Sequence, residues 1–481
     1  MGLFNEDNSS VALRFFEEIS SIPRPSYHEN LIADYLVDFA RQHSLEHYRD
    51  KLNNVIIIKE ASLGYENEPA VILQGHSDMV CVKDSDCDKD MLKEGLDLVI
   101  DGDILYANGT SLGADDGVAI AYALAILSSD SIKHPRIEFA CTVCEEVGME
   151  GAAAIDLSNL KGHTLINIDS ETEGEALCGC AGGGLFSISL SVMRSKFFEG
   201  IRAGIEVGGL SGGHSGEEID KGRGNAIFIL AQALRYIYNS DNSLALISLS
   251  GGEKDNAIPK FASANITVSD IMLLKDTINK FQDLIKEQYR ISDPNLYIKV
   301  TPCTSEDKPL SSYSSLDVIS FLATLPDGVI KMSNTVDSLV ETSLNLGVCN
   351  ISDDKLNLKY CVRSSVPQSY KLLIEKLIWL SKSSGATYSI SGEYPAWPWA
   401  RESRIREKFK SAYKELFNKE LYVCAIHAGV ECGLLMQKIP NLDAISIGPD
   451  AYDIHTTSER MSISSFERVF KLLTKVLEDK S

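Results

Sequence analysis

The sequence predicts an α/β fold in which a mixed sheet flanked by helices is interrupted by an inserted α+β domain. Short apolar runs that end in an acidic residue alternate with helical patterns near the start of the chain, and the alternation resumes near its end. This pattern is typical of an open α/β sheet with its site at the carboxyl ends of the strands. It changes at Gly179–Gly184 (GCAGGG) and returns after Pro395–Trp399 (PAWPW). We therefore expect residues 1–184 and 395–481 to form one domain, and residues 185–394 a second domain inserted into it.

The composition indicates a soluble, multidomain protein. A length of 481 residues exceeds one ordinary domain, and the hydrophobic fraction of 44% is usual for globular chains. The formal net charge of -22 repels nucleic acid and anionic membranes, so we expect neither as a partner. The 11 cysteines are scattered, and the chain shows neither a signal-peptide pattern nor a membrane-spanning apolar run. These features predict a cytoplasmic protein.

Apolar periodicity predicts the first elements. Apolar residues recur at helical spacing on both sides of a proline pair, in Ala12–Ile19 and Leu31–Phe39. Short apolar runs predict strands at Asn54–Lys59 and Ala70–Gln74, followed by a hairpin-like stretch at Asp101–Tyr106.

The stretch Val71–Asp78 (VILQGHSD) combines a strand with a His-x-Asp triplet at its end. Side chains two residues apart in an extended chain point to the same side, so His76 and Asp78 should face one pocket. A carboxylate beside an imidazole fixes its tautomer and leaves the other ring nitrogen free to bind a metal.

The next candidates lie in Gly109–Leu127, where a Gly-rich loop leads into an Ala-rich helix with Asp115 and Asp116 at its start. Helix capping is one explanation for either aspartate, because acidic residues are favoured at a helix N-terminus. Two adjacent aspartates in a tight loop after a strand exceed what a cap requires.

Two further apolar strands end in acidic residues. Arg136–Cys144 leads into Glu145 and Glu146, and Leu165–Asp169 (LINID) ends in an aspartate. Adjacent side chains at the exit of a strand diverge, so one glutamate can bind a metal while its neighbour reaches a water. A solvated loop pair is the alternative, but the preceding FACTVC run belongs in a core.

The inserted region shows two similar passes of strands and helices, which indicates a doubled unit. The first pass begins with a strand at Phe186–Leu190, and the second begins near Leu339. After residue 394 the α/β pattern resumes, and it includes His455 in an IHTTSER segment. The expected elements of the insertion and of the C-terminal part are strands at Ile201–Val207, Thr342–Val348, Leu356–Val362, Thr387–Ser391, Leu421–Ile426 and Asp443–Ile447 and helices at Gly224–Tyr238, Ile271–Tyr289, Ser369–Ser384, Ile405–Phe417 and Ile463–Leu477.

Taken together, the polar residues at the strand ends suit a divalent metal centre. Any one of these acids or histidines is more often a solvated or satisfied residue. Their joint occurrence after apolar strands favours zinc or manganese, a metal-activated water and a free carboxylate that moves protons. The set is His76, Asp78, Asp115, Glu145, Glu146, Asp169 and His455.

The motifs GHSDMV, GTSLGADDGVAIAYALAIL, CEEVGMEGA, NIDSE, GGHSG, VECG and IHTTSER resemble those of the aminoacyl-histidine dipeptidases, also called Xaa-His or cytosol nonspecific dipeptidases. These form a branch of the dinuclear zinc aminoacylase/carboxypeptidase superfamily. The resemblance covers essentially the whole chain. It implies a zinc-peptidase-like catalytic domain and an inserted lid domain.

The resemblance also implies roles for individual residues. His76 and Asp169 would bind one Zn²⁺, Glu146 and His455 the other, and Asp115 would bridge them. Asp78 would fix His76, and Glu145 would act as general base and then acid. The peptide bond after Asp115 would be cis. Relatives often carry Asn where Asp116 stands, and we expect no loss of metal binding from this departure.

In the lid, the resemblance implies that His214 stabilises the oxyanion and that Asn256 and Arg363 hold the substrate carboxylate. Glu431 is a candidate partner for the substrate's α-amino group. The alternatives are a turn histidine, a turn asparagine before Ile-Pro and a surface strand arginine.

The resemblance thus implies hydrolysis of unblocked dipeptides, including Xaa-His and with β-alanyl-histidine as a candidate, by a metal-bridging water. Two Zn²⁺ per chain are expected, with Mn²⁺ or Co²⁺ as substitutes, in a monomer or homodimer. The alternatives are an N-acyl-amino-acid deacylase or tripeptidase of the same superfamily, and a non-catalytic binding protein on the same fold.

Overall fold

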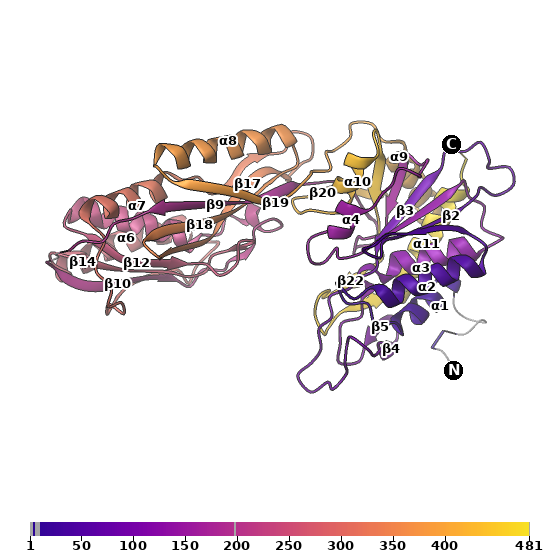
Figure 1. The fold of residues 1–481 in the computed structure, drawn as a ribbon, viewed down its shortest axis with the longest axis horizontal. Coiled ribbons are helices and arrows are strands. Elements are labelled where there is room, and N and C mark those ends of the chain that lie inside the picture. Colours follow the sequence, from indigo (N-terminus) through magenta and orange to yellow (C-terminus); the bar gives the residue numbers. More distant parts are fainter. Residues whose placement is uncertain (1–2, 5–9, 197–198, 481) are drawn as a thin grey trace. The chain divides into compact units, whose positions relative to one another are not determined.

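The computed structural model describes residues 3–4, 10–196 and 199–480. Contacts between residues divide the chain into two compact units (Figure 1). Unit 1 comprises Met1–Gly179, Trp399–Ala425 and Val430–Ser481, and unit 2 comprises Cys180–Pro398 and Ile426–Gly429. The sequence predicts all of residues 395–481 in the first domain, but the short segment 426–429 belongs to unit 2. It does so because the Ala181 N–H lies 3.2 Å from the Ile426 carbonyl and 3.1 Å from the Ala428 carbonyl.

Unit 1 contains a mixed sheet with the strand order β1-β2-β6-β3-β7-β21-β8-β20. Strand β3 runs parallel to β6 and β7, and β21 runs parallel to β7, whereas β1, β2 and β8 pair antiparallel. The carboxyl ends of β3, β6 and β7 therefore meet at one edge of the sheet. The strands are β1 (Glu46–Arg49), β2 (Val55–Lys59), β3 (Val71–His76), β6 (Ile137–Thr142), β7 (Thr164–Asn167), β8 (Glu175–Cys180), β20 (Tyr422–Ile426) and β21 (Asp443–Ser446).

A smaller sheet of unit 1 has the order β22-β23-β5-β4, with β4 (Leu98–Asp101), β5 (Ile104–Ala107), β22 (Ala451–Tyr452) and β23 (Arg460–Ser462). Strands β4 and β5 form the predicted hairpin.

The helices α1, α2, α3 and α11 lie on one side of the larger sheet of unit 1 (Figure 1). They share an apolar core with alternate strand residues such as Val55, Ile57, Leu73 and Phe139. Burying each such side chain contributes about 1.5–3 kcal/mol. The helices of the unit are α1 (Val11–Ser20), α2 (Asn30–Gln42), α3 (Ala114–Ser128), α4 (Glu150–Ala154), α9 (Arg404–Phe417), α10 (Cys432–Lys438) and α11 (Ile463–Glu478).

Unit 2 is built on a second sheet with the order β15-β10-β14-β12-β17-β18-β9-β19, to which β16 adds by pairing with β17. A separate two-stranded sheet joins β11 to β13. The strands are β9 (Gly182–Ser191), β10 (Ile201–Gly208), β11 (Gly213–His214), β12 (Ala245–Gly251), β13 (Ala257–Ile258), β14 (Ala262–Val268), β15 (Tyr297–Thr301), β16 (Gly328–Met332), β17 (Val340–Ser352), β18 (Lys355–Ser364) and β19 (Thr387–Tyr394).

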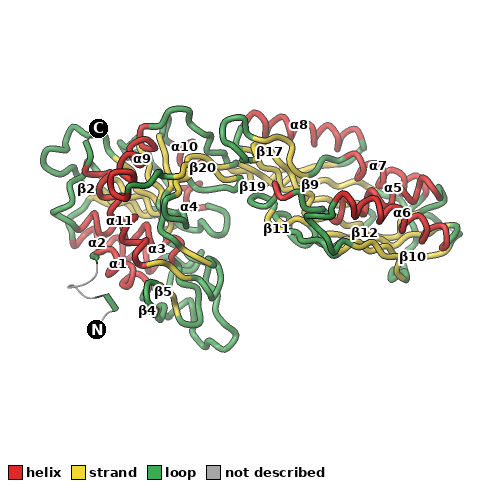
Figure 2. Tube along the Cα trace, turned by 180° about the vertical axis from the view of Figure 1, so that it is seen from behind, coloured by secondary structure: helices red, strands yellow, loops and turns green. Residues whose placement is uncertain are grey.

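The helices of unit 2 cover one face of its sheet (Figure 2) and share a core with alternate residues of β9, β10, β14 and β18. They are α5 (Ala226–Ser240), α6 (Ile271–Gln288), α7 (Ser312–Thr324) and α8 (Pro367–Ser383). The short 3₁₀ helix η1 (Ile219–Lys221) packs Ile219 against Ile258 and Val340 instead.

The strand order of unit 2 shows a doubled β-α-β-β-α-β unit. One half runs β10, α5, β12, β14, α6, β15, and the other runs β9, α7, β17, β18, α8, β19. Within each half the spatial order of the strands is fourth, first, third, second, as in ferredoxin-like units. The sequence prediction assigned the strand at Phe186–Leu190 to the first pass, and this was wrong. That strand lies in β9 and pairs with β18 and β19, because one half is inserted after the first strand of the other.

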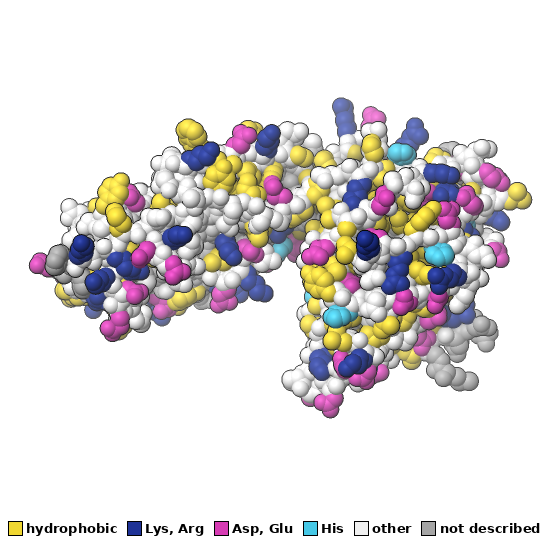
Figure 3. Space-filling view, viewed as in Figure 1, with side chains coloured by type: hydrophobic (Ala, Val, Ile, Leu, Met, Phe, Trp, Pro, Cys, Tyr) yellow, Lys and Arg dark blue, Asp and Glu magenta, His cyan; other side chains and the backbone are white. Residues whose placement is uncertain are grey.

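On the face of the molecule in Figure 3, basic and acidic side chains are interspersed. The formal charge of -22 is therefore not gathered there into a single acidic patch. Within the described ranges, no helix combines the length and apolar character needed to cross a bilayer.

Candidate metal centre

The candidate metal ligands of unit 1 gather at the carboxyl ends of its parallel strands. His76 is the last residue of β3, Glu145 and Glu146 follow β6, and Asp169 follows β7. Parallel pairing of β3 with β6 and β7 brings these three strand ends together. Two more side chains reach the same place from outside the sheet: Asp115 from the first turn of α3, and His455 from the turn between β22 and β23.

The Asp115 carboxylate lies between the two imidazoles. Its Oδ1 is 2.9 Å from Nε2 of His76, and its Oδ2 is 3.0 Å from Nε2 of His455. A carboxylate that presents one oxygen to each of two imidazoles has the geometry of a bridging ligand.

Each imidazole also faces a second carboxylate. His76 Nε2 is 3.5 Å from Asp169 Oδ1, and His455 Nε2 is 3.0 Å from Glu146 Oε1. The ligand atoms of His76, Asp115 and Glu146 all lie within 4.8 Å of one another, as do those of His76, Asp116 and Asp169. The structure thus brings together all five residues predicted as ligands, and it adds Asp116 to the cluster.

Asp78 orients both His76 and the loop that carries the two glutamates. Its backbone carbonyl lies 3.0 Å from Nδ1 of His76, and its Oδ1 lies 3.4 Å from the same nitrogen and accepts the Glu145 N–H at 3.0 Å. Its Oδ2 accepts the Glu146 N–H at 3.3 Å and the Ser26 hydroxyl at 2.8 Å. With Nδ1 directed at Asp78, the Nε2 atom of His76 faces the carboxylates, which is the orientation a metal ligand needs.

The electrostatics of the cluster fit divalent cations. Burial raises the pKa of Asp169 to about 6 and that of Glu145 well above its usual value. The carboxylates of Asp115 and Glu146 raise the pKa of His455 to about 10. Buried acids in this number need positive charge near them, and bound metal ions would supply it.

The Asp116 carboxylate accepts backbone N–H groups, whereas the Asp115 carboxylate faces two imidazoles. The peptide bond between them is cis, as the family resemblance implied. Asp116 is buried, its Oδ2 accepts the backbone N–H of His76 at 3.1 Å, and its Oδ1 accepts the Ala119 N–H at 3.1 Å. Its hydrogen bonds therefore position the backbone of His76 and the start of α3.

In unit 2, the predicted residues His214 and Asn256 lie on adjacent segments. His214 ends β11 and pairs with Ala257 of β13, and the Ser215 N–H donates to the Asn256 carbonyl at 2.9 Å. Burial, aided by the charge of Arg363, lowers the pKa of His214, so its imidazole is neutral at pH 7.

Arg363 lies beside His214. Around Arg363 are two further residues, Tyr394 and His427, that were not predicted from the sequence. A Cβ built on Gly216 would be 3.1 Å from Cε1 of His214 and 3.3 Å from Nε of Arg363. Arg363 Nη1 donates to the Tyr394 hydroxyl at 2.7 Å. His427 Nε2 is 2.7 Å from the Ser343 hydroxyl, and Ser343 is the direct cross-strand neighbour of Arg363. His427 and Tyr394 carry no motif signal, and only the fold brings them to Arg363.

Comparison with known proteins agrees with this geometry. The model of peptidase family M20/M25/M40 matches residues 72–479. The chain belongs to this peptidase family. It is 37% identical over 471 residues to the cytosol non-specific dipeptidase of Escherichia coli (strain K12), covering 96% of each chain.

Two solved structures share the fold of this chain. The aminoacylhistidine dipeptidase from Vibrio alginolyticus is 34% identical and superposes with a TM-score of 0.92, over 98% of this chain and 96% of that one. A tripeptidase from Staphylococcus aureus shares the fold, with a TM-score of 0.57 at 16% identity over 99% of each chain.

Two buried charged residues of this M20 chain hold the ligand loops, and neither was predicted. Arg24 donates from Nη1 to the Ser77 carbonyl at 3.1 Å and from Nη2 to the Gly113 carbonyl at 2.5 Å. Glu459 accepts the N–H groups of residues 112, 113 and 114 at 2.8, 3.0 and 2.8 Å. Together they fix the backbone on both sides of the cluster. Glu459 was within reach of sequence analysis, since it belongs to the IHTTSER motif, but Arg24 stands between two prolines without a pattern.

We expect Glu459→Ala to weaken metal binding by about 10- to 100-fold, the usual effect of removing a group that orients metal ligands. The substitution frees the backbone N–H groups that precede Asp115. Competition with a chelator of known affinity measures the change. Glu478→Ala, an exposed position on α11, is the control. Equal metal affinity in both variants would contradict the positioning role.

Glu431, the candidate partner of a substrate amino group, is fully buried. Its Oε2 accepts hydrogen bonds from Gln74 Nε2 at 2.6 Å and from Thr142 Oγ1 at 2.7 Å, and Oε1 makes no hydrogen bond. Burial raises the pKa of Glu431 to about 7. The contact to substrate stays a prediction.

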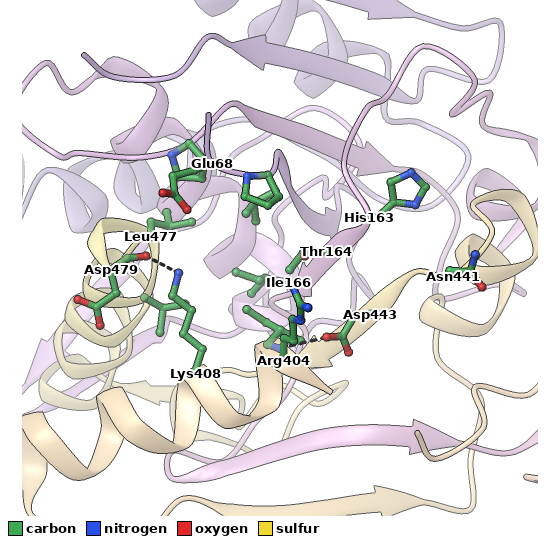
Figure 4. Close-up of a pocket in the computed structure, with 15 residues that line it drawn as sticks. Glu68, His163, Thr164, Ile166, Arg404, Lys408, Asn441, Asp443, Leu477 and Asp479 are labelled. Atoms are coloured by element: carbon green, nitrogen blue, oxygen red, sulfur yellow. Dashed lines mark hydrogen bonds between the residues drawn. The ribbon is translucent and has the colours of Figure 1, made fainter. Parts of the chain in front are cut away.

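A cavity of about 340 Å³ lies at the opposite ends of β3 and β7 from the metal ligands (Figure 4). Its polar side chains serve the fold. Lys408 Nζ donates to the carbonyl of Asp479 at the end of α11, and Asp443 Oδ2 accepts the Ile405 N–H at the start of α9. The candidate chemistry of unit 1 therefore lies at the carboxyl edge of the sheet.

Proposed function

We propose that this chain is a metal-dependent dipeptidase that hydrolyses unblocked dipeptides, including Xaa-His. The observation that carries the proposal is the Asp115 carboxylate placed between His76 and His455, in a chain of the M20 peptidase family. The names of the two relatives with 37% and 34% identity support the substrate class.

We infer that two Zn²⁺ ions bind per chain, with Mn²⁺ or Co²⁺ as substitutes. His76 and Asp169 would hold one, Glu146 and His455 the other, and Asp115 both. The mixed set of imidazoles and carboxylates suits these borderline ions. When bound, such ions lower the pKa of water and polarise the scissile carbonyl.

Glu145 is the proposed general base and then acid. Its backbone N–H donates to Asp78 Oδ1. Among the described residues, neither histidine of the cluster forms a hydrogen bond with the Glu145 side chain, whereas His455 forms one with Glu146. Burial raises the pKa of Glu145, which brings a carboxyl group closer to the operating pH where proton transfer in both directions is efficient.

Residues of unit 2 are proposed to bind the substrate. The neutral imidazole of His214 would donate a hydrogen bond to the oxyanion. Asn256 and Arg363 would hold the carboxylate of the dipeptide, for which the guanidinium fork of arginine is suited. Glu431 is the weaker candidate for the α-amino group.

We expect Arg363→Lys to raise KM for dipeptides by roughly 10- to 100-fold, because a hydrogen bond to a charged group contributes about 1.5–3 kcal/mol. Lysine keeps the charge but loses the planar fork and the bond to Tyr394. Steady-state kinetics provide the measurement, and Arg202→Lys on β10 is the control. An unchanged KM for Arg363→Lys would remove this residue from the substrate site.

The function is tested by comparing a free Xaa-His dipeptide, its N-acetylated form and a matching tripeptide, with metal content measured on the same sample. Cleavage of the free dipeptide alone, lost on chelation, is the expected result. Preference for the acetylated form or the tripeptide would move the activity to a deacylase or tripeptidase. Bound metal without turnover would favour a non-catalytic binding protein.

We also infer a cytoplasmic location and a monomer or homodimer. All 11 cysteines lie within the described residues and none of them forms a disulfide, as expected in a reducing compartment. The Escherichia coli relative is named a cytosol enzyme. Sedimentation of the purified protein distinguishes monomer from dimer.

A further inference from the structure

Unit 2 contains a cavity of about 590 Å³ that the proposed reaction does not use. This volume is within the range of about 300–1,000 Å³ that small-molecule sites occupy. The cavity lies between the start of α5, the ends of α6 and α7, and strand β16. Its walls are rich in neutral polar groups, including the side chains of Asn225, Gln232, Gln288 and Asn345.

Asp327 is a carboxylate of this cavity, and within the described ranges no Lys, Arg or His side chain forms an ion pair with it. Its Oδ1 accepts the Leu346 N–H at 3.0 Å and Asn225 Nδ2 at 3.4 Å, and the carboxylate also accepts the backbone N–H of Gly328. Asn225 Nδ2 is also 3.1 Å from the Leu346 carbonyl, so it only partly serves Asp327. Arg223, the basic residue of the lining, pairs with Glu218 at 3.0 Å instead. Burial raises the pKa of Asp327 to about 7, as expected for a carboxyl group without a counter-charge.

The helix ends around the cavity favour positive over negative charge. Tyr289 and Leu325, both in the lining, are the residues at which α6 and α7 end, and a helix C-terminus attracts cations. The N-terminus of α5 also meets the cavity, but its first amides are occupied: Ala226 N–H donates to the Pro259 carbonyl and Ile227 N–H to Asn225 Oδ1. The aromatic rings of Phe228 and Tyr289 add surfaces that attract cations.

The back wall of the cavity supports the segment that carries Asn256 and His214. Asn345 Nδ2 donates to the Asp255 carbonyl at 3.3 Å and to the Ala257 carbonyl at 2.9 Å, on either side of Asn256. Ile258, another lining residue, pairs with Gly213 beside His214. A molecule in the cavity would therefore contact the groups that position both residues.

We propose that this cavity is a binding site for a small molecule with a primary ammonium group, which pairs with Asp327 while the amides of Gln232 and Gln288 bind its polar body. The site is separate from the residues assigned to hydrolysis. It does not depend on the proposed function.

The test is calorimetric titration of the metal-loaded protein with glycinamide, which carries an ammonium group, and with acetamide, which does not. We expect saturable binding of glycinamide and none of acetamide. Asp327→Asn should weaken glycinamide binding at least tenfold, since asparagine keeps an acceptor for Leu346 but loses the charge. Asp220→Asn, which removes an exposed carboxylate of the same lining, should change the affinity less than twofold.

A second variant guards against a folding defect in Asp327→Asn. Gln232→Trp fills part of the cavity without altering the carboxylate and should also weaken glycinamide binding at least tenfold. Thermal melting of each variant establishes that it is folded. The proposal would be overturned if the wild type did not bind glycinamide. It would also be overturned if folded Asp327→Asn and Gln232→Trp bound glycinamide as tightly as the wild type. Dipeptide hydrolysis is measured separately, so a failure here leaves the proposed function standing.

Discussion

Replacing Glu145 with Gln should lower kcat by about 10²- to 10⁴-fold, the usual contribution of a positioned acid–base group, while the metal content stays unchanged. The amide keeps the size of the side chain but cannot accept a proton from water. Asp115, Glu146 and the two histidines are untouched by the substitution, and their mutual contacts do not involve the Glu145 side chain. Steady-state kinetics and metal analysis on the same preparation provide both readouts.

The matched control is Glu150→Gln. Glu150 starts α4 a few residues further along the same loop, and its side chain is exposed. This change removes one acidic charge near the site without altering the candidate base, so kcat should stay within about twofold, as for most surface substitutions. If both variants lost activity equally, charge near the cluster rather than proton transfer by Glu145 would be responsible. Full activity of Glu145→Gln would assign the base elsewhere.

The fold class was predictable because the strands of unit 1 carry strong local signals. Residues 55–58 form a continuous β-branched run, and Ile137–Thr142 is interrupted by a single charged residue, Glu138, which pairs with Arg136; such runs are typical of strands buried on both faces. Helix α7 was not predicted from the sequence, because the start of this helix is rich in serine. Its N-cap, Ser311, accepts a hydrogen bond from the Ser314 N–H, a capping signal that was present in the sequence.

Strand pairing in unit 2 was less accessible. Each strand can be recognised from its own residues, but its neighbour depends on contacts between distant segments. The insertion of one half after β9 separates that strand from β18 by well over a hundred residues, and β9 was therefore grouped with the wrong half. The same limit explains segment 426–429, whose carbonyls pair with Ala181.

The candidate metal ligands were accessible for a related reason: each stands directly at the end of a recognisable strand or in a motif. Parallel pairing then brings them together without further information. Arg24 has no such marker. His427 directly follows the expected strand Leu421–Ile426, but nothing in the sequence indicates that this strand end lies near Ser343. Arg24 acts through backbone carbonyls on two loops, and His427 acts through Ser343 on a strand far away in sequence. Groups that act by holding other segments are recognised only when those segments are seen in space.

The adjacent aspartates offer the sharpest test of the centre. Asp115→Asn should remove at least one of the two metal ions and nearly all activity, because each of its oxygens faces an imidazole and an amide nitrogen cannot replace a carboxylate oxygen as a ligand. Metal analysis after gel filtration, with kcat on the same sample, measures this loss.

Asp116→Asn should retain both metal ions and most of the activity. The oxygens of Asp116 accept two backbone N–H groups, those of His76 and Ala119, and the asparagine oxygen can still accept one of them. The two variants differ by one position and make the same change from carboxyl to amide, so they compare the two side chains directly. Equal metal loss in both would mean that Asp116 is itself a ligand with His76 and Asp169, which their spacing permits. Loss confined to Asp115→Asn would instead identify the carboxylate between the two imidazoles as the one that the centre depends on.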